Sequence, residues 1–240
     1  MEITKFTNTT RKLTRPPYCT AIIVAAGSAS RMGGIDKVMA ELGGEPMIVR
    51  SVRTFQECDA IREIVIVTRQ DLVVPIMGLC HGFDKVQTVT VGGSSRQESV
   101  RAGLSAMSKK TKLVAVHDGA RPLITASLID TTVRAARAYG AAAPAVAVKD
   151  TIKEVRGGVV TATPERRFLQ AVQTPQIFDV DLLNAALVKA EEDAAEVTDD
   201  CSAVERMGMS VKIVPGDEHN IKITTPTDLK IAEAFLEEEA

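Results

Sequence analysis

Short continuous runs of apolar residues alternate along the chain with segments of helical periodicity. The apolar runs are rich in β-branched residues and predict buried strands at residues 21–25, 64–68, 86–91, 113–117 and 143–148. Helical patterns lie between them, near residues 47–57, 71–79, 97–107 and 127–139. Strands that lack polar alternation and are separated by helices are typical of a mostly parallel sheet covered on both faces. The pattern therefore predicts a three-layer α/β fold.

Residues 150–174 interrupt this alternation. Two stretches, 151–155 and 159–163, surround Arg156-Gly157-Gly158, which predicts a β-hairpin with a glycine turn. A polar hairpin has little core to bury itself against, so we expect an arm that projects toward a partner subunit. Beyond it, the pattern predicts helices near 180–192 and 198–207, strands near 211–214 and 220–224, and a last helix. Thr225 and Asp228 have the spacing of a capping box at the start of that helix.

Three loops that combine glycine with charged residues follow the first, third and fourth predicted strands. They are residues 25–34 with the sequence AAGSASRMGG, residues 92–99 with GGSSRQES, and residues 117–122 with HDGARP. In an open parallel sheet, ligands bind beyond the carboxyl ends of the strands. The three loops therefore predict one binding site along a single edge of the sheet.

The first loop has the composition of a phosphate-binding loop. Small residues at Ala25, Ala26 and Gly27 let backbone N–H groups approach phosphate oxygens closely. Arg31 offers a forked pair of donors, and Lys37 offers a point charge. The spacing matches neither the P-loop motif nor the dinucleotide-binding motif G-x-G-x-x-G. For this loop alone, a glycine-rich turn with a solvated arginine and lysine is the alternative.

The second loop opens a predicted helix. Ser95 and Glu98 have the spacing of a capping box, and Ser99 follows them in the first turn. The backbone N–H groups of Gly92 and Gly93 are candidate donors to a base edge or a ribose. An ordinary strand–helix turn is the alternative.

The third loop places Asp118 three residues before Arg121. The pair predicts either a structural ion pair or an aspartate near substrate hydroxyl groups or Mg²⁺, which the arginine helps to order. His117 is expected to be packed at the strand end rather than to act as a base. Lys222, in the apolar stretch 220–224, either points to solvent or completes a phosphate cage.

Composition narrows the class of protein. The 240-residue chain has a net charge of −2 and 3% aromatic residues, so it lacks the basic surface and stacking side chains typical of nucleic-acid binding. Its cysteines are scattered without C-x-x-C spacing, which indicates reduced thiols in the cytoplasm and predicts no metal site. No apolar run reaches the ~20 residues of a membrane span. We expect residues 1–18 to form a disordered extension and residues 19–240 to form a single domain.

Several segments in chain order also carry a resemblance to a known family. They are AAGSASRMG (25–33), GGSSRQESV (92–100), HDGARP (117–122), VKDTIK (148–153), ERRFLQAVQTPQ (165–176), TDDCSAVE (198–205) and NIKIT (220–224). Together they resemble the 2-C-methyl-D-erythritol 4-phosphate cytidylyltransferase family over about residues 20–238. The resemblance implies a nucleotide-diphosphosugar-transferase fold, a homodimer that exchanges the arm at 150–174, and Mg²⁺ held largely by the phosphates of CTP. It also implies transfer of CMP from CTP to methylerythritol phosphate, with release of pyrophosphate.

The resemblance implies a role for individual residues. Those implied to stabilise the reacting phosphate or to position the acceptor are Arg31, Lys37, Arg166 and Lys222. Contacts with CTP are implied for Ala25, Ala26, Gly27, Gly93, Ser94 and Ser99. The acceptor pocket is implied to be shaped by Asp118, Arg121, Thr151 and Thr174. Arg166, on the arm, is implied to reach the acceptor phosphate across the dimer interface.

Two positions depart from the pattern of the family. Asp36 stands before Lys37 where many members have proline, and its carboxylate favours the charged form of the amine. Ser94 stands where many members have an acidic residue for the ribose, although its hydroxyl still offers a hydrogen bond. Two other functions stay open. They are transfer of CMP to ribitol 5-phosphate, and binding of CTP without catalysis.

Overall fold

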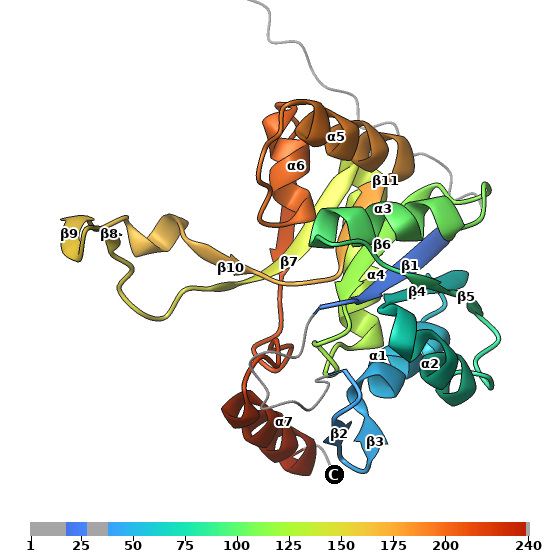
Figure 1. Ribbon diagram of the computed structural model, residues 1–240. Coiled ribbons are helices and arrows are strands. Elements are labelled where there is room, and N and C mark those ends of the chain that lie inside the picture. The colour runs from blue at the N-terminus through green and yellow to red at the C-terminus, as the bar shows by residue number, and fades with distance from the viewer. Residues whose placement is uncertain (1–17, 28–37, 239–240) are drawn as a thin grey trace, which may run out of the picture.

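Strand β1 (Cys19–Ala25) lies between two parallel neighbours, β4 (Glu63–Thr68) and β6 (Leu113–Asp118), inside the main sheet (Figure 1). The computed structural model describes residues 18–27 and 38–238. Every residue of β4 and β6 is buried. Strands covered on both faces explain why these runs show no polar alternation in the sequence.

The main sheet has the strand order β10-β7-β11-β6-β1-β4-β5, and β12 pairs with β7. The remaining strands of this sheet are β5 (Val86–Val91), β7 (Ala141–Ala147), β10 (Gln170–Val172), β11 (Gln176–Asp179) and β12 (Lys212–Pro215). Strand β1 pairs in parallel with β4 and β6. Strand β4 pairs in parallel with β5, and β12 pairs in parallel with β7. Strands β10 and β11 run antiparallel to their neighbours. The predicted mostly parallel α/β sheet is confirmed, with two antiparallel strands that the sequence pattern did not predict.

Helices cover both faces of this sheet. One hydrophobic cluster includes residues of α1 (Met47–Glu57), α2 (Val73–Leu79) and α4 (Ala126–Tyr139), and a 3₁₀ turn at Gln70–Leu72 precedes α2. The other cluster includes residues of α3 (Arg96–Ala106), α5 (Val180–Glu192) and α6 (Asp200–Arg206). Alternate residues of β1 face opposite clusters, since Ile23 belongs to the first and Ile22 to the second. Figure 1 shows α3, α5 and α6 on one side of the sheet and α1 and α2 on the other.

A third, smaller cluster joins the end of the chain to the hairpin of β2 (Glu41–Leu42) and β3 (Glu45–Pro46). Leu42, Ile223 and Ala232 of α7 (Pro226–Glu238) are fully buried in it. The predicted capping box of α7 is confirmed, because Asp228 accepts the N–H of Thr225 at 2.8 Å and donates its own N–H to the Thr225 hydroxyl at 3.3 Å. Among the described residues, no helix has the length and apolar character needed to cross a membrane.

The prediction of a strand at 220–224 is wrong. These residues have no sheet partner within the described part of the chain. Ile223 donates its backbone N–H to the carbonyl of Ala120 at 2.8 Å, while its side chain enters the small cluster. The segment is therefore anchored to the loop after β6 rather than to a strand.

The predicted hairpin is confirmed and projects from the sheet (Figure 1). Strands β8 (Glu154–Arg156) and β9 (Val159–Ala162) pair antiparallel, and every residue in both is exposed. Gly157 and Gly158 have φ values of +55° and +79°, the left-handed conformation that a two-residue hairpin turn needs. The chain returns through a 3₁₀ turn at Arg166–Phe168 into β10, which pairs with β7. The projecting part therefore ends before β10, short of the predicted boundary at residue 174.

Candidate active site

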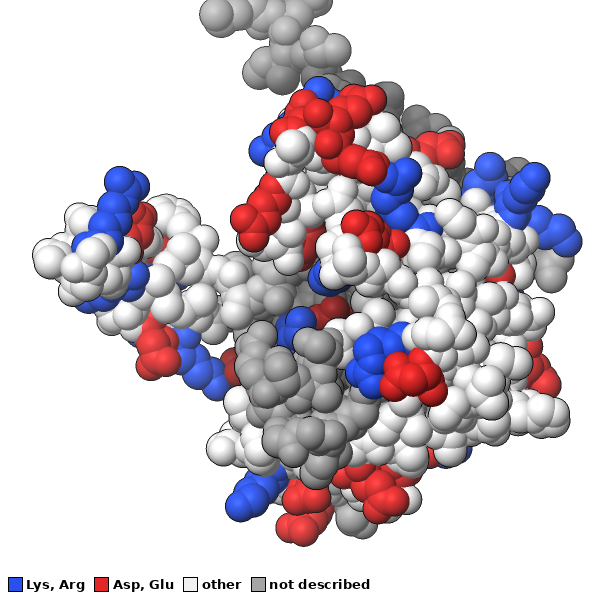
Figure 2. All heavy atoms as spheres, in the orientation of Figure 1, with Lys and Arg blue, Asp and Glu red and all other residues white. Residues whose placement is uncertain are grey.

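The three predicted loops meet at one pocket of about 310 Å³ beyond the ends of β1, β5 and β6. Its lining residues are Val24, Ala25, Ala26, Gly27, Val38, Gly93, Ser94, Ser95, Arg96, Ser99, Asp118, Ala120 and Lys222. Figure 2 shows acidic and basic side chains together in a hollow near the centre of the visible face. The prediction that separate loops form a site at one sheet edge agrees with this geometry.

Close backbone approach joins the first loop to the second. A Cβ atom added to Gly92 would lie 2.7 Å from the Cβ of Ala26 and 2.6 Å from the Ser99 hydroxyl oxygen. A Cβ atom on Gly93 would lie 2.2 Å from the Cβ of Glu98. Contacts this short leave no room for a side chain, so glycine at both positions is required by the packing of the loop.

The hydroxyl of Ser99 holds the second loop in place. It accepts the N–H of Gly93 at 3.2 Å and donates to the carbonyl of Ser95 at 2.9 Å. The N–H of Gly92 donates to the Thr68 carbonyl at 2.8 Å. The two glycine N–H groups suggested by the sequence as donors to a nucleotide are therefore already bonded within the protein.

Only half of the predicted capping box forms at α3. Ser95 is the N-cap, and its hydroxyl accepts the N–H of Glu98 at 3.1 Å. The Glu98 carboxylate turns instead to Ser94, from which it accepts the N–H at 2.6 Å and the hydroxyl at 2.8 Å. These bonds lower the pKa of Glu98. Ser94 thus lies directly against a carboxylate of its own chain.

Asp118, at the end of β6, is surrounded by cationic groups. One of its carboxylate oxygens lies 2.7 Å from the ammonium of Lys222 and 4.0 Å from Nε of Arg121. Its other oxygen lies 3.6 Å from Nε of Arg96. Burial raises the pKa of Asp118, but Lys222 and Arg96 outweigh burial and bring the pKa to about 2. Asp118 is therefore a carboxylate at neutral pH.

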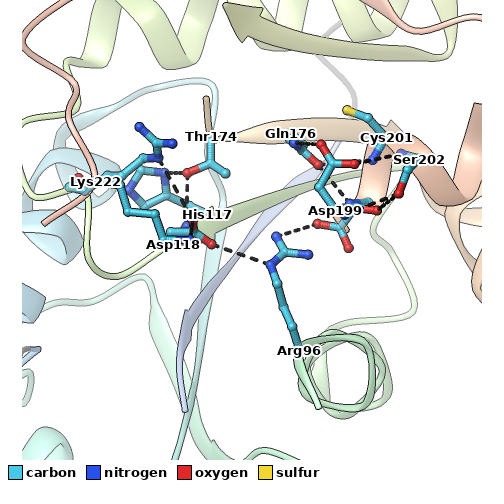
Figure 3. Close-up of polar contacts among 11 residues, drawn as sticks. Arg96, His117, Asp118, Thr174, Gln176, Asp199, Cys201, Ser202 and Lys222 are labelled. Atoms are coloured by element: carbon cyan, nitrogen blue, oxygen red, sulfur yellow. Dashed lines mark hydrogen bonds and ion pairs between the residues drawn. The ribbon is translucent and has the colours of Figure 1, made fainter. Parts of the chain in front are cut away.

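Arg96 is a member of the site that the sequence did not reveal. It is the first residue of α3, and its Nη2 lies 2.8 Å from Oδ2 of Asp200 at the start of α6. Figure 3 shows its guanidinium between Asp118 on one side and the first turn of α6 on the other. Burial lowers the pKa of Arg96, but Asp200 and Asp118 outweigh it and raise the pKa above its ordinary value. The only sequence signal was the position of Arg96 directly after an N-cap serine.

His117 supports the loop that carries Asp118. Its Nε2 lies 3.1 Å from the Arg121 carbonyl, an acceptor, so Nε2 carries the proton. Its Nδ1 therefore accepts from the Thr174 hydroxyl at 3.0 Å, and that hydroxyl in turn accepts the Asp118 N–H at 3.1 Å. Burial lowers the pKa of His117 to about 4, and its ring packs against Phe55 at a centroid distance of 4.9 Å. This agrees with the expectation of a packed histidine rather than a base.

Arg121 connects the third loop to the segment that bears Lys222. Its Nη1 donates to the Asn220 carbonyl at 2.6 Å. Asn220 is fully buried, and its side-chain amide donates to the carbonyl of Thr174 at 3.0 Å. Within the described part of the chain, Nε of Arg121 is buried without a hydrogen-bond partner. Arg121 therefore holds the Asn220 segment beside the third loop and does not itself line the pocket.

The pocket contains some of the predicted site residues and not others. Those that line it are Ala25, Ala26, Gly27, Gly93, Ser94, Ser99, Asp118 and Lys222. Arg121 and Thr174 lie behind Asp118, bonded to it or to its neighbours. Thr151 and Arg166 are exposed on the arm, where Nη1 of Arg166 donates to the carbonyl of Lys149 at 2.6 Å. Arg31, Lys37 and Asp36 lie outside the described residues.

The described residues offer one carboxylate at the pocket and no metal cage. No group of three or more His, Cys, Asp or Glu side chains among residues 18–27 and 38–238 is placed to hold a metal ion. Mg²⁺ is usually bound by substrate phosphates and one or two carboxylates rather than by an all-protein cage. The site is therefore compatible with a cation that a bound polyphosphate carries. Its glycine loops and its cationic side chains are suited to phosphate ligands.

Comparison with known protein families gives a match over nearly the whole chain. The family model described as IspD, 2-C-methyl-D-erythritol 4-phosphate cytidylyltransferase, matches residues 19–238. A protein of that description from Symbiobacterium thermophilum is 48% identical over 221 residues, which are 91% of this chain and 93% of the relative. Another from Caldanaerobacter subterraneus subsp. tengcongensis is 44% identical over 221 residues, 90% of this chain and 97% of the relative.

Solved structures with the same fold are described either as a 4-diphosphocytidyl-2C-methyl-D-erythritol synthase or as a 2-C-methyl-D-erythritol 4-phosphate cytidylyltransferase. The 4-diphosphocytidyl-2C-methyl-D-erythritol synthase of Anaerococcus prevotii superposes with a TM-score of 0.84 at 33% identity, over 92% of this chain and 99% of the other. The 2-C-methyl-D-erythritol 4-phosphate cytidylyltransferase of Thermus thermophilus gives a TM-score of 0.75 at 30% identity, over 90% and 98%. The expected type of α/β fold is confirmed by these likenesses.

Proposed function

Since the chain belongs to the 2-C-methyl-D-erythritol 4-phosphate cytidylyltransferase family, we propose that the pocket around Asp118 is where it carries out the family's reaction. The activity is transfer of CMP from CTP to 2-C-methyl-D-erythritol 4-phosphate in the nonmevalonate pathway. The products are 4-diphosphocytidyl-2-C-methyl-D-erythritol and pyrophosphate. The observation that carries the assignment of the site is the Lys222–Asp118 pair, 2.7 Å apart beside two glycine loops.

The reaction needs charge stabilisation more than it needs a protein nucleophile. A phosphate oxygen of the acceptor attacks the α-phosphorus of CTP, and the bond to the β-phosphate breaks as pyrophosphate leaves. Cationic groups around the α-phosphate stabilise the charge that builds up on its oxygens. We propose that Arg31 and Lys37, which lie outside the described residues, supply that charge.

CTP lies against the first two loops in this proposal. Ala25 ends β1, Ala26 and Gly27 follow it, and all three line the pocket with Gly93 of the second loop. Ser99 contributes by fixing Gly93 through its hydroxyl. Ser94 offers a hydroxyl suited to a ribose hydroxyl, and Glu98 fixes Ser94 by accepting its N–H and its hydroxyl hydrogen.

The acceptor lies on the side of the pocket toward Lys222. The Lys222 side chain is 44% exposed, so its ammonium is accessible to an anionic group as well as to Asp118. Asp118 forms the adjoining wall with Arg121 behind it, and the Thr174 hydroxyl accepts the backbone N–H of Asp118 and holds it in place. The acceptor's phosphate pairs with Lys222, which aligns one of its oxygens with the α-phosphorus of CTP.

A homodimer explains why Thr151 and Arg166 lie on the arm. Both are exposed there, and neither lines the pocket of its own chain. The arm also exposes apolar side chains, with Val159 67% and Phe168 72% accessible. Exposed apolar groups on a projecting hairpin are suited to a partner subunit. In the dimer, Arg166 of one subunit reaches the acceptor phosphate bound to the other.

In this proposal, Mg²⁺ binds to the site together with CTP. When bound, the ion neutralises part of the charge on the triphosphate. Asp118 is the described carboxylate at the pocket, and it is already paired with Lys222. The ion is therefore held mainly by the phosphates and water. The cytoplasmic location expected from the scattered cysteines belongs to the same proposal.

The experiment that tests this function uses the full chain with CTP, Mg²⁺ and methylerythritol phosphate. Pyrophosphate release is followed over time, and the nucleotide product is identified by mass spectrometry. Equal amounts of pyrophosphate and 4-diphosphocytidyl-methylerythritol are expected. CTP binding without any turnover would instead support the non-catalytic alternative.

A further inference from the structure

Arg96 joins two acidic side chains that come from different elements. Its Nη2 lies 2.8 Å from Asp200 at the start of α6, and its Nε lies 3.6 Å from Asp118 at the end of β6. Asp118 lies 2.7 Å from the ammonium of Lys222. The charges therefore alternate in a row from the buried start of α6 to the pocket, in the order Asp200, Arg96, Asp118, Lys222. Figure 3 shows Arg96, Asp118 and Lys222 of this row.

The row is buried at one end and accessible at the other. The side chain of Asp200 is 2% exposed and that of Asp118 is 11%, whereas that of Lys222 is 44% exposed. Charges in a buried environment interact more strongly than charges in water, since the effective dielectric constant is lower. Replacement of Arg96 therefore changes the electrostatic potential at Asp118 and, through Asp118, the interaction with Lys222.

The two carboxylate oxygens of Asp118 face different cations. Lys222 lies against Oδ2, and Arg96 lies on the side of Oδ1. A cation on one oxygen reduces the negative charge that the other offers to its own partner. Arg96 therefore weakens the hold of Asp118 on the Lys222 ammonium.

We propose that Arg96 is a positioning residue that keeps Lys222 available to the phosphate of the acceptor by sharing the charge of Asp118. The proposal rests on the proposed function, because it takes Lys222 as the group that binds the acceptor phosphate. Asp200 competes with Asp118 for Arg96 and so sets how much of the guanidinium charge reaches Asp118. Without Arg96, the Lys222 ammonium stays paired with Asp118, and the acceptor phosphate has to break this ion pair before it binds.

A purely structural role for Arg96 makes a different prediction. If the Arg96–Asp200 pair only joins α3 to α6, loss of either partner should have similar effects. In the charge-sharing proposal, the two losses act in opposite directions. Removal of Arg96 strengthens the grip of Asp118 on Lys222, whereas removal of the Asp200 charge releases Arg96 toward Asp118 and weakens that grip.

The test compares the KM values for methylerythritol phosphate and for CTP in a set of variants. Arg96→Gln is expected to raise the acceptor KM roughly tenfold, a loss of ~1.4 kcal/mol, with less effect on the CTP KM. Asp200→Asn is expected to lower the acceptor KM. Arg96→Lys, which keeps the charge, is expected to recover most of the loss. Arg101 lies on the same helix as Arg96 and pairs at the surface with Glu191 of α5, so Arg101→Gln serves as the matched control.

The double variant Arg96→Gln/Asp200→Asn removes the buried charge that the single variant leaves without a partner. A folding defect caused by that unpaired charge is therefore absent from the double variant. Its acceptor KM is still expected to lie above the wild-type value. A rise in the CTP KM alone would make Arg96 a nucleotide contact and overturn the proposal. An acceptor KM that returns to the wild-type value in the double variant would overturn it too, since the defect of Arg96→Gln would then come from the unpaired charge of Asp200 and not from Lys222.

A second measurement separates this proposal from the proposed function. The rate at which acetic anhydride modifies Lys222 is read from peptide mass spectra of the full chain without substrates. A tighter ion pair leaves less free amine, so Arg96→Gln is expected to slow this modification and Asp200→Asn to speed it. Unchanged rates in both variants would contradict the charge-sharing idea even where the wild-type protein turns over. If the modification rates change as expected but the wild-type protein shows no turnover, the charge-sharing proposal stands and the proposed function is contradicted.

Discussion

The ammonium of Lys222 lies 2.7 Å from a carboxylate oxygen of Asp118, although the two residues lie far apart in the sequence. The contact exists because Ile223, next to Lys222, bonds to Ala120 and fixes the late segment beside the loop after β6. A polar group supplied by a segment without sheet partners thus completes a site whose other walls are strand ends.

Replacement of Lys222 is expected to separate activity from stability. Lys222→Met should lower kcat/KM for the acceptor on the order of 100-fold, because a charged group at the reacting phosphate is lost. The free energy of unfolding should change by less than about 1 kcal/mol, since the side chain is 44% exposed and Asp118 keeps its arginine neighbours. Steady-state kinetics and urea unfolding check the two expectations. Lys230→Met on α7 is the control, and an inactive control or an active Lys222→Met would contradict this role.

His117 makes stability depend on pH. Its pKa in the folded protein is about 4 because of burial, below the ordinary value of about 6.5 for the unfolded chain. Between these values the unfolded chain binds a proton that the folded protein does not, so stability falls as the pH drops from about 6.5 to about 4. The loss over the whole window is about 3 kcal/mol.

His117→Gln should remove this part of the pH dependence while costing stability at pH 7, where the ring packs against Phe55. Urea unfolding at pH 7 and at pH 4.5 measures both effects. If the variant and the wild-type protein lose the same free energy between the two pH values, His117 is not the titrating group.

Glycine at position 93 should be needed for the shape of the nucleotide loop. The Cβ atom of Gly93→Ala would lie 2.2 Å from the Cβ of Glu98, so the loop has to shift. We expect a loss of about 1–3 kcal/mol in stability and a weaker affinity for CTP. Gly82→Ala is the matched control, because its Cβ would meet no heavy atom of the described residues within 4 Å. Calorimetric titration with CTP compares the two, and equal affinities would show that the loop tolerates a side chain.

The arm predicts a site shared between subunits. Arg166→Ala and Lys37→Ala should each be nearly inactive as homodimers, because one lacks the acceptor contact and the other a charge at the α-phosphate. Mixed dimers should regain part of the wild-type rate, since one of their two sites then has both residues intact. Pyrophosphate release after subunit exchange, verified by native mass spectrometry, measures the recovery. Exchanged dimers that stay inactive would place Arg166 in its own subunit's site or outside the mechanism.

Much of this fold follows from the sequence pattern. The buried strands lack polar alternation because helices cover both faces. The five strands predicted before the arm, and the one predicted at 211–214, overlap strands of the main sheet. Strands β10 and β11 were not predicted, because each is short and their pairing with β7 and β6 depends on the rest of the sheet. The stretch 220–224 was wrongly predicted as a strand, because its apolar residues are buried against α7 and the β2–β3 hairpin instead.

The candidate site could be predicted only in part. Loops that follow parallel strands converge by topology, so Asp118 and Gly93 were placed at one edge from the sequence. The ion pair between Arg96 and Asp200 could not be predicted, since it depends on how α6 docks beside α3. The roles of Ser99 and Thr174 as supports for the loops likewise appear only when their hydrogen bonds are known.

The acceptor preference tests the central claim most directly. The kcat/KM for pyrophosphate release is measured with CTP and Mg²⁺, once with methylerythritol phosphate and once with ribitol 5-phosphate. The account predicts that the full chain strongly prefers methylerythritol phosphate and that Lys222→Met loses most of this activity. A preference for ribitol 5-phosphate, or full activity without Lys222, would contradict it.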